Sequence, residues 1–320
     1  MRSCPALAAA AFAAIALQLT CGNEDMPPAV GDDGAGCGVC EREYVSRMGE
    51  LYPAVARDIR EAVCPERAHE RPTSNHPLII GAGQGTTGTR SISTAVYELG
   101  FSTLHFRSFG PREDSATPGR VPVKYFVQGG PPDDAYRLEE LLDKMDELDG
   151  PACNRLALET DWRMYDTVDS VFDSPIPQFW WDIWKTYPNA SVILSTRDPG
   201  QWAVRRQTFC QAEPNCRGTA PWLHPCLHYI SQLTPEGLAR AYAISNDFVR
   251  CVVPPDRLLE VNVFNNDDSG ALWPRLAEFL GKYSYPDKPF PRGGVGQKHQ
   301  RRPSGPGRAG RFANFRVGVP

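Results

Sequence analysis

The sequence predicts an α/β fold in which helices cover both faces of a parallel β-sheet. Between residues 78 and 280, short apolar runs typical of buried strands alternate with longer segments of helical periodicity. Such alternation favours parallel strands joined by crossover helices. A glycine-rich segment, PLIIGAGQGTTGTRSI, begins as a strand at Pro77 and ends as a helix at Ile92. Because N–H groups at a helix start bind anions, we expect a phosphate site there.

The expected elements follow in chain order. A helix over residues 41–63 has apolar residues at helical spacing, with cysteines on either side. Strands are expected at residues 78–80, 101–106, 167–172, 191–196 and 257–263. Helices are expected at residues 91–99, 136–148, 176–187, 235–250 and 272–280. The helix at 235 has the clearest start, because Thr234 is a good cap and Pro235 suits the first helical position.

The first 22 residues are predicted to be a secretory signal peptide. Arg2 precedes an apolar run over residues 5–17, which is shorter than the about 20 residues that span a membrane. A short uncleaved signal anchor is the alternative. We therefore expect the protein in the secretory pathway, in the Golgi lumen or secreted.

Four further segments are expected after the signal. They are an acidic linker over 23–36, a helical lead-in over 37–75, a main domain over 76–292 and a basic, disordered tail over 293–320. The formal net charge of −4 gives no reason to expect nucleic acid as a partner.

The cysteine count favours disulfides. Eight cysteines lie beyond the signal, and an even number in a secretory protein indicates pairing. Zinc binding by Cys37 and Cys40 is the weaker alternative, because no second pair stands at zinc-site spacing. No metal is therefore expected. Three cysteines share one loop, and we expect at least two of them to be bonded: Cys210, Cys216 and Cys226.

The glycine segment departs from two common phosphate loops. In the dinucleotide pattern G-x-G-x-x-G, the third glycine would fall on Thr86. An NADP-dependent oxidoreductase with an atypical loop stays open, since Arg107 follows the second strand. In the ATP/GTP pattern, Thr89 and Arg90 stand where the Lys and the Ser or Thr belong. A kinase or GTPase is therefore disfavoured.

The run GTTGTRSI resembles the phosphosulfate-binding loop of sulfotransferases, P-R-T-G-T-x-S-L. Four residues match it: Thr87, Gly88, Thr89 and Ser91. A second stretch, ASVILSTRDPGQWAVRR, resembles the strand and helix with which the family binds the donor's 3′-phosphate. Its R-D-P-x-x-W pattern falls on Arg197, Asp198, Pro199 and Trp202. Residues 165–190 and 275–292 resemble the family's D-x-P strand with its aromatic helix, and its C-terminal helix.

This resemblance implies a three-layer α/β/α fold of the P-loop-containing nucleotide hydrolase type. It implies transfer of a sulfuryl group from 3′-phosphoadenylyl sulfate, without a metal, to a hydroxyl or amine. The expected partner is an acceptor such as a glycan or another hydroxyl compound. A membrane is expected only if the N-terminal segment stays as an anchor.

The resemblance also implies binding residues for the donor. The phosphosulfate is expected against the loop and helix start, which comprise Gly85, Thr86, Thr87, Gly88, Thr89, Arg90 and Ser91. The 3′-phosphate is expected against Arg197, and against Arg205, which stands where the family has Ser. The family carries a Lys or Arg in the place of Thr86. We expect Arg90 to replace that cation; without it, the chain would be an inactive glycan-binding relative.

The base that takes the acceptor's proton has two candidates. Asp173 lies at the end of the third predicted strand, at the point where some relatives carry a His, and is the first candidate. Its alternative role is to cap the helix that starts near Pro175. His105, at the end of the second strand, is the second candidate, because it faces the same edge of the sheet.

Overall fold

The computed structural model describes residues 37–65, 71–105, 141, 144–145, 148, 150–212, 220–224, 233–264 and 270–292. Contacts divide the chain into Met1–Gly36 and Cys37–Pro320, and every described residue belongs to the second unit. The predicted signal, linker and basic tail, and most of the helix predicted at 136–148, lie outside the described residues.

The core of the fold is a parallel sheet of five strands. They are β1 (Ile79–Gly81), β2 (Thr103–His105), β3 (Ser170–Phe172), β4 (Ser191–Ser195) and β5 (Leu258–Val261). Their spatial order is β2-β3-β1-β4-β5. Four of them lie within the predicted segments, and β1 extends one residue beyond its predicted segment, to Gly81. From β1 the chain continues to β2 on one side of β1, and from β3 it crosses to β4 on the other side. The carboxyl end of β1 is therefore a topological switch point, which is where ligands bind in such sheets.

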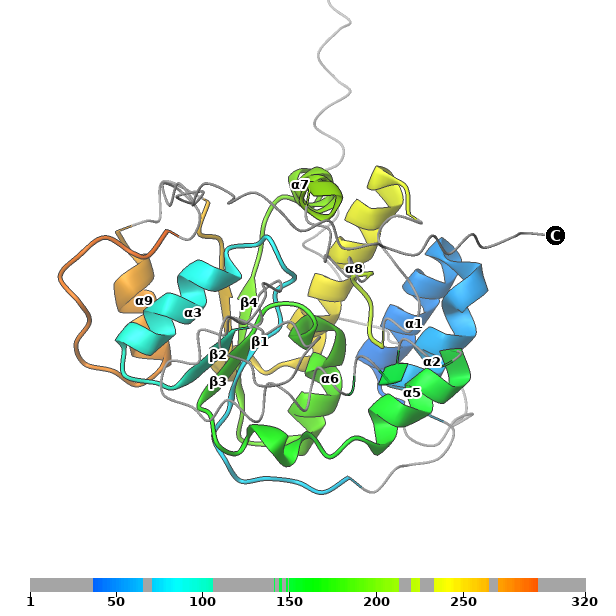
Figure 1. Cartoon of the computed structure of the whole chain (residues 1–320), viewed down its shortest axis with the longest axis horizontal. Helices are drawn as coiled ribbons and strands as arrows, with labels where there is room; N and C mark the ends of the chain where they lie inside the picture. The colour runs from blue at the N-terminus through cyan, green and yellow to red at the C-terminus, as the bar shows by residue number, and fades with distance from the viewer. Residues whose placement is uncertain are drawn as a thin grey trace, which may run out of the picture. The chain divides into compact units, whose positions relative to one another are not determined.

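Helices cover both faces of this sheet (Figure 1). The described helices are α1 (Val39–Leu51), α2 (Ala56–Val63), α3 (Thr89–Glu98), α5 (Gly150–Glu159), α6 (Ile176–Thr186), α7 (Pro199–Ala212), α8 (Pro235–Val252) and α9 (Leu272–Phe279). Helices α3 and α9 share one core with the sheet, whereas α6, α8 and α1 share the other. The predicted three-layer α/β/α fold is therefore confirmed. Within the described residues, no helix is both long and apolar enough to cross a membrane.

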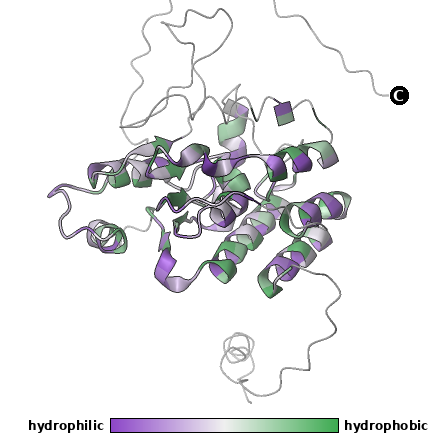
Figure 2. Cartoon of the chain, turned by 90° about the horizontal axis from the view of Figure 1, so that it is seen from below, coloured by the Kyte–Doolittle hydropathy of each residue, from purple (hydrophilic) through white to green (hydrophobic). Residues whose placement is uncertain are grey.

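The strands bury side chains on both faces, which explains their apolar sequences. Ile80 and Val171 belong to the core on the α6 side, and Ile79 and Phe172 to the core on the α3 side. This division follows from the two-residue period of a strand. Hydrophobic and hydrophilic residues alternate along the outer helices (Figure 2), as expected for helices with one buried side.

The lead-in differs from the prediction. A single helix was expected over residues 41–63, but α1 ends at Leu51, a short 3₁₀ turn covers Pro53–Val55, and α2 begins at Ala56. Pro53 has no N–H to continue α1, and it disfavours helical geometry at Tyr52, whose φ and ψ are −135° and 73°. The single-helix prediction was therefore wrong. Helix α5 was not predicted, because Gly-Pro at its start is also typical of a turn.

One disulfide lies within the lead-in, and a second attaches the lead-in to the rest of the unit. Cys37 is bonded to Cys64, and Cys40 to Cys251, so α1 is linked to α8. The disulfide prediction is confirmed for these cysteines, and the zinc alternative was wrong. Cys153 and Cys210 are disulfide-bonded as well. Cys216 and Cys226 lie outside the described residues.

A buried charged cluster surrounds Asp182 on α6. Asp182 has no exposed surface and forms ion pairs with Arg71 and His224, with Nζ of Lys185 at 3.9 Å. Burial alone would raise the pKa of Asp182. The charge and hydrogen bond of His224, with Lys185 and Arg71, outweigh burial and hold that pKa well below its usual range. The cluster joins α6 to two segments distant in sequence.

We expect Asp182→Asn to lower the free energy of unfolding by about 3–5 kcal/mol, because it leaves buried cationic partners without their anion. The folded-state pKa of Asp182 is depressed, so its contribution is present at neutral pH and is lost as pH falls below about 4. The difference between wild type and variant in urea unfolding should therefore shrink between pH 7 and pH 3. Asp247→Asn, at a half-exposed ion pair, is the control and should cost less than about 1 kcal/mol. Equal costs for both variants would contradict this.

Candidate functional site

The glycine loop connects β1 to α3 at the carboxyl edge of the sheet. Gly88 has φ 94°, and a Cβ there would lie 2.1 Å from Cγ2 of Val263, so only glycine fits without strain. Thr87 is fully buried, and its hydroxyl bonds to the carbonyl of Gln84 and to Oγ of Ser195 at 2.6 Å. These hydrogen bonds hold the loop against β4. The first N–H groups of α3, which have no partner within the helix, lie beside the loop.

Thr86 occupies a strained part of this loop. Its φ is 71°, which is rare for a β-branched residue. Its Oγ1 is buried and, among the described residues, has no hydrogen-bond partner. The same holds for Nε of Arg90 and Nε of Arg197. Strain and unpaired polar atoms concentrate at binding sites, and two of these three atoms carry positive charge. The loop therefore fits an anionic ligand.

The R-D-P-x-x-W segment lies directly against the loop. Gln201 N–H donates to Oδ1 of Asp198 at 2.9 Å, which caps the start of α7. Nε1 of Trp202 donates to the carbonyl of Gly85 at 2.9 Å, and Nη1 of Arg197 lies 3.5 Å from the carbonyl of Thr86. The structure thus brings the two predicted motifs together.

Tyr242, from α8, holds this segment in place. Its ring stacks on Trp202 with centroids 4.2 Å apart, and its hydroxyl accepts a hydrogen bond from Arg197 N–H at 3.0 Å. The guanidinium of Arg197 lies 4.2 Å from the centre of the half-exposed ring of Phe264. Arg197 is therefore fixed at its backbone, while its side chain stays partly open to a ligand.

The two arginines that end the predicted motif take different positions. Arg205, the residue predicted from the sequence, is exposed on α7. Arg206 is buried, and Nη2 lies 3.3 Å from Oγ of Ser174. Sequence reasoning missed Arg206. Its spacing of four residues from Trp202 was the available signal, since residues i and i+4 share one helix face.

Asp173 and His105 meet beside the loop. Asp173 has φ 73°, and Oδ1 accepts a hydrogen bond from Ser174 N–H at 2.9 Å. Its Oδ2 lies 3.5 Å from Nε2 of His105, and that nitrogen lies 3.3 Å from Oγ1 of Thr89. Helix α6 takes its N-cap from Pro175 without a side-chain hydrogen bond. The alternative role of Asp173 as a helix cap is therefore not observed.

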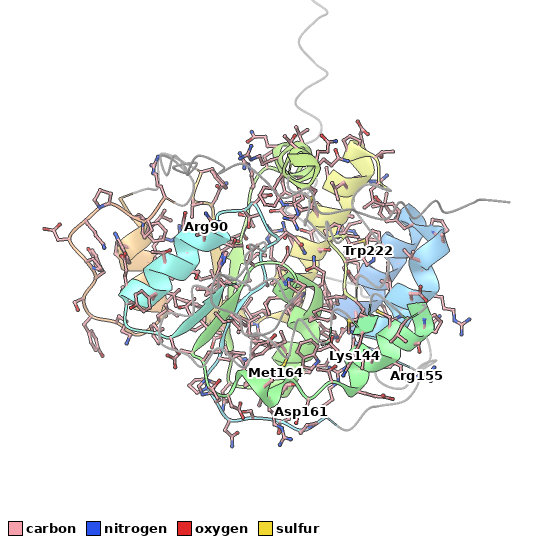
Figure 3. The ribbon with its side chains drawn as sticks, in the orientation of Figure 1. Arg90, Lys144, Arg155, Asp161, Met164 and Trp222 are labelled. Carbon is pink, nitrogen blue, oxygen red and sulfur yellow. A yellow bond between two sulfur atoms is a disulfide. The ribbon has the colours of Figure 1, made fainter. Side chains whose placement is uncertain are left out.

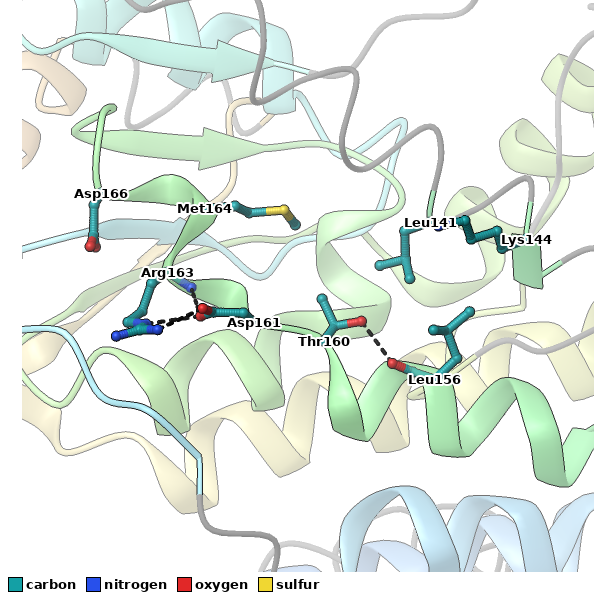
Figure 4. A pocket seen from close by; sticks show the side chains of 8 residues that line it. All are labelled: Leu141, Lys144, Leu156, Thr160, Asp161, Arg163, Met164 and Asp166. Atoms are coloured by element: carbon teal, nitrogen blue, oxygen red, sulfur yellow. Dashed lines mark hydrogen bonds and ion pairs between the residues drawn. The ribbon is translucent and has the colours of Figure 1, made fainter.

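A separate pocket lies at the opposite edge of the sheet. It has a volume of about 520 Å³ and precedes β3 in the chain (Figure 4), lined by Leu141, Lys144, Leu156, Thr160, Asp161, Arg163, Met164 and Asp166. None of the predicted site residues contributes to it, so we place the candidate site at the glycine loop. No group of three or more His, Cys, Asp or Glu side chains is positioned to hold a metal ion in the part of the chain that the structure describes.

Comparison with known proteins gives one family. A family model described as a sulfotransferase domain matches residues 78–299. No curated protein matches the sequence. A crystal structure of a Mycobacterium tuberculosis sulfotransferase is similar at 13% identity and TM-score 0.34, over 77% of this chain and 84% of that one. At that TM-score the structural similarity adds no weight to the family match.

We expect Gly88→Ala to destabilise the protein more than Gly100→Ala. Both glycines have φ near 90°, but a Cβ at Gly88 meets Val263, whereas nothing lies within 4 Å at Gly100. The shared backbone strain should cost about 1–2 kcal/mol, and displacement of Val263 about 1–3 kcal/mol more. Urea unfolding of the two variants measures the difference, and equal losses would show that the approach to Val263 is not limiting.

Proposed function

This chain belongs to the sulfotransferase family, and from that premise we propose that it transfers a sulfuryl group from 3′-phosphoadenylyl sulfate to a hydroxyl or amine. The observation that carries the proposal is the contact between the two motifs. Trp202 and Arg197 both reach carbonyl groups of the glycine loop. A loop for one phosphate and a cation for another thus lie side by side, as a donor with 5′- and 3′-phosphates requires.

The residues present fit this donor. N–H groups at the start of α3 suit the 5′-phosphosulfate, and the unpaired Nε of Arg90 lies in the same first turn. Arg197 suits the 3′-phosphate, because a guanidinium pairs with phosphate through two hydrogen bonds. Arg205 can add to this charge from the exposed side of α7.

Asp173 is the proposed base. Its side chain is 22% exposed, whereas that of His105 is 2% exposed, so an acceptor can reach the carboxylate but not the imidazole. His105 and Ser174 each contact one oxygen of Asp173 and so orient the carboxylate. When the donor is bound, its S–O bond to the 5′-phosphate breaks, the electron pair stays on the phosphate oxygen, and the acceptor oxygen bonds to sulfur. Asp173 receives the acceptor's proton.

We further propose that the acceptor is a glycan or another hydroxyl compound of the secretory pathway. The disulfides Cys37–Cys64 and Cys40–Cys251 support an oxidising compartment. Sulfate transfer from radiolabelled donor to a panel of glycans, phenols, steroids and tyrosine peptides tests the acceptor class.

Ligand-dependent stabilisation tests the donor. Adenosine 3′,5′-bisphosphate at a hundred times its dissociation constant is expected to stabilise the protein by about 2.7 kcal/mol, with no shift from NADP or ATP. A thermal-shift titration measures this. Stabilisation by NADP alone would instead favour an oxidoreductase. Binding of the bisphosphate without any sulfate transfer would favour an inactive glycan-binding relative.

We expect Asp173→Asn to lower kcat by about 10²- to 10⁴-fold, because the amide cannot accept the acceptor's proton. Binding of adenosine 3′,5′-bisphosphate should be preserved, since the loop and Arg197 hold that ligand. Asp161→Asn, an exposed acid at the opposite edge of the sheet, is the control and should change neither quantity. Near-normal turnover of Asp173→Asn would exclude Asp173 as the base.

A further inference from the structure

Arg206 is a buried cation beside the glycine loop. Only 7% of its surface is exposed. Burial lowers the pKa of Arg206, and the nearby charge of Asp173 opposes that effect; a guanidinium stays protonated in such surroundings. Among the described residues, no carboxylate forms an ion pair with Arg206, and its Nη2 donates a hydrogen bond to Oγ of Ser174. A buried cation without a paired anion is costly, so this position is suited to bind an anionic ligand.

The guanidinium of Arg206 lies against Gly85. A Cβ on Gly85 would lie 2.7 Å from Nη1 of Arg206, and 3.0 Å from Oδ1 of Asp173 and from Oγ of Ser174. Gly85 directly precedes Thr86, the position at which sulfotransferase loops carry their cation. Arg206 therefore places a positive charge at the same turn of the loop from which that cation is missing.

The rotation of α7 explains why Arg206 faces the loop. Trp202, four residues earlier, lies on the same helix face and is fixed by its hydrogen bond to Gly85 and its stacking on Tyr242. Arg205, one residue before Arg206, lies about 100° away from it around the helix and is exposed. Packing of Trp202 thus selects which of the two arginines lies against the glycine loop.

We propose that Arg206 supplies the positive charge that the loop lacks at Thr86, and that it stabilises the 5′-phosphate oxygen from which the sulfuryl group departs. This inference rests on the function proposed above. Negative charge on that oxygen grows as the S–O bond breaks, and a donor that is already fixed in place stabilises it most. The contact with Ser174 and the burial of Arg206 provide that fixation.

Two other assignments compete with this one. Arg90 lies at the start of α3 (Figure 3) and would act from that helix. Alternatively, Arg206 serves only as a structural counter-charge for Asp173. In that case its removal would lower stability without changing how the protein distinguishes ligands by their 5′-phosphate.

The test compares two ligands that differ only in the 5′-phosphate, adenosine 3′,5′-bisphosphate and adenosine 3′-monophosphate, by calorimetry on the full chain. We expect Arg206→Met to weaken binding of the bisphosphate by about 10- to 100-fold, as loss of a hydrogen bond between charged groups does. Binding of the 3′-monophosphate should change by less than about twofold, because Arg197 is untouched. Arg206→Lys should recover part of the loss, since it keeps the charge but not the planar fork.

Arg155→Met is the matched control. Arg155 is exposed on α5 (Figure 3), which packs on the side of the sheet opposite α3, and its removal should affect neither ligand. Unchanged bisphosphate affinity in Arg206→Met would overturn the proposal. So would a loss that appears in Arg90→Met and not in Arg206→Met. If the wild type binds neither ligand, the proposed function fails, and this inference fails with it.

A second comparison covers the case in which Arg206→Met does not fold. The double variant Asp173→Asn/Arg206→Met removes the nearby carboxylate together with the cation, which avoids leaving either charge buried alone. Measured against Asp173→Asn, it should show the same selective loss of bisphosphate binding. Equal bisphosphate affinities in these two proteins would contradict the proposal, and 3′-monophosphate binding reports that both are folded.

Discussion

The site depends on one close approach, that of Gly85 to α7. Trp202 donates a hydrogen bond to the carbonyl of Gly85, and a side chain at this position would occupy the space of Arg206. Because α7 begins at the end of β4 and the loop follows β1, this contact joins the connections after two neighbouring strands. The position of Arg197 follows from it, since the residue lies between β4 and α7.

Two buried charged groups near α6 show opposite solutions to the cost of burial. Asp182 has cationic partners on several sides, so its charge is neutralised within the fold and contributes to stability at neutral pH. Arg206 has Ser174 as its polar neighbour, and the carboxylate of Asp173 is close without forming an ion pair. The paired charges around Asp182 stabilise the fold, whereas Arg206, a cation without a paired anion, is suited to bind an anionic ligand.

Much of this architecture was predictable because it depends on residues that are close together in the sequence. A strand buried on both faces needs an uninterrupted apolar run, and all five runs that were predicted became strands. The loop was predictable from its glycines and the helix that follows. Gly88, directly before α3, has a left-handed conformation that favours glycine, and the N–H groups at the start of a helix bind anions. The break in the lead-in was also local, since Pro53 marks it, and the helical periodicity on either side concealed it.

The sequence by itself thus determined the order of elements, the loop and the place of Arg197, because each depends on residues close together in the chain. Only the tertiary structure decided that His105 meets Asp173, since β2 and β3 are neighbours in the sheet but 67 residues apart at their paired positions. It also decided that Arg206 rather than Arg205 faces the loop. The two arginines are adjacent, so the local sequence does not distinguish them. The rotation of α7 is set by packing against α8, which is distant in the sequence.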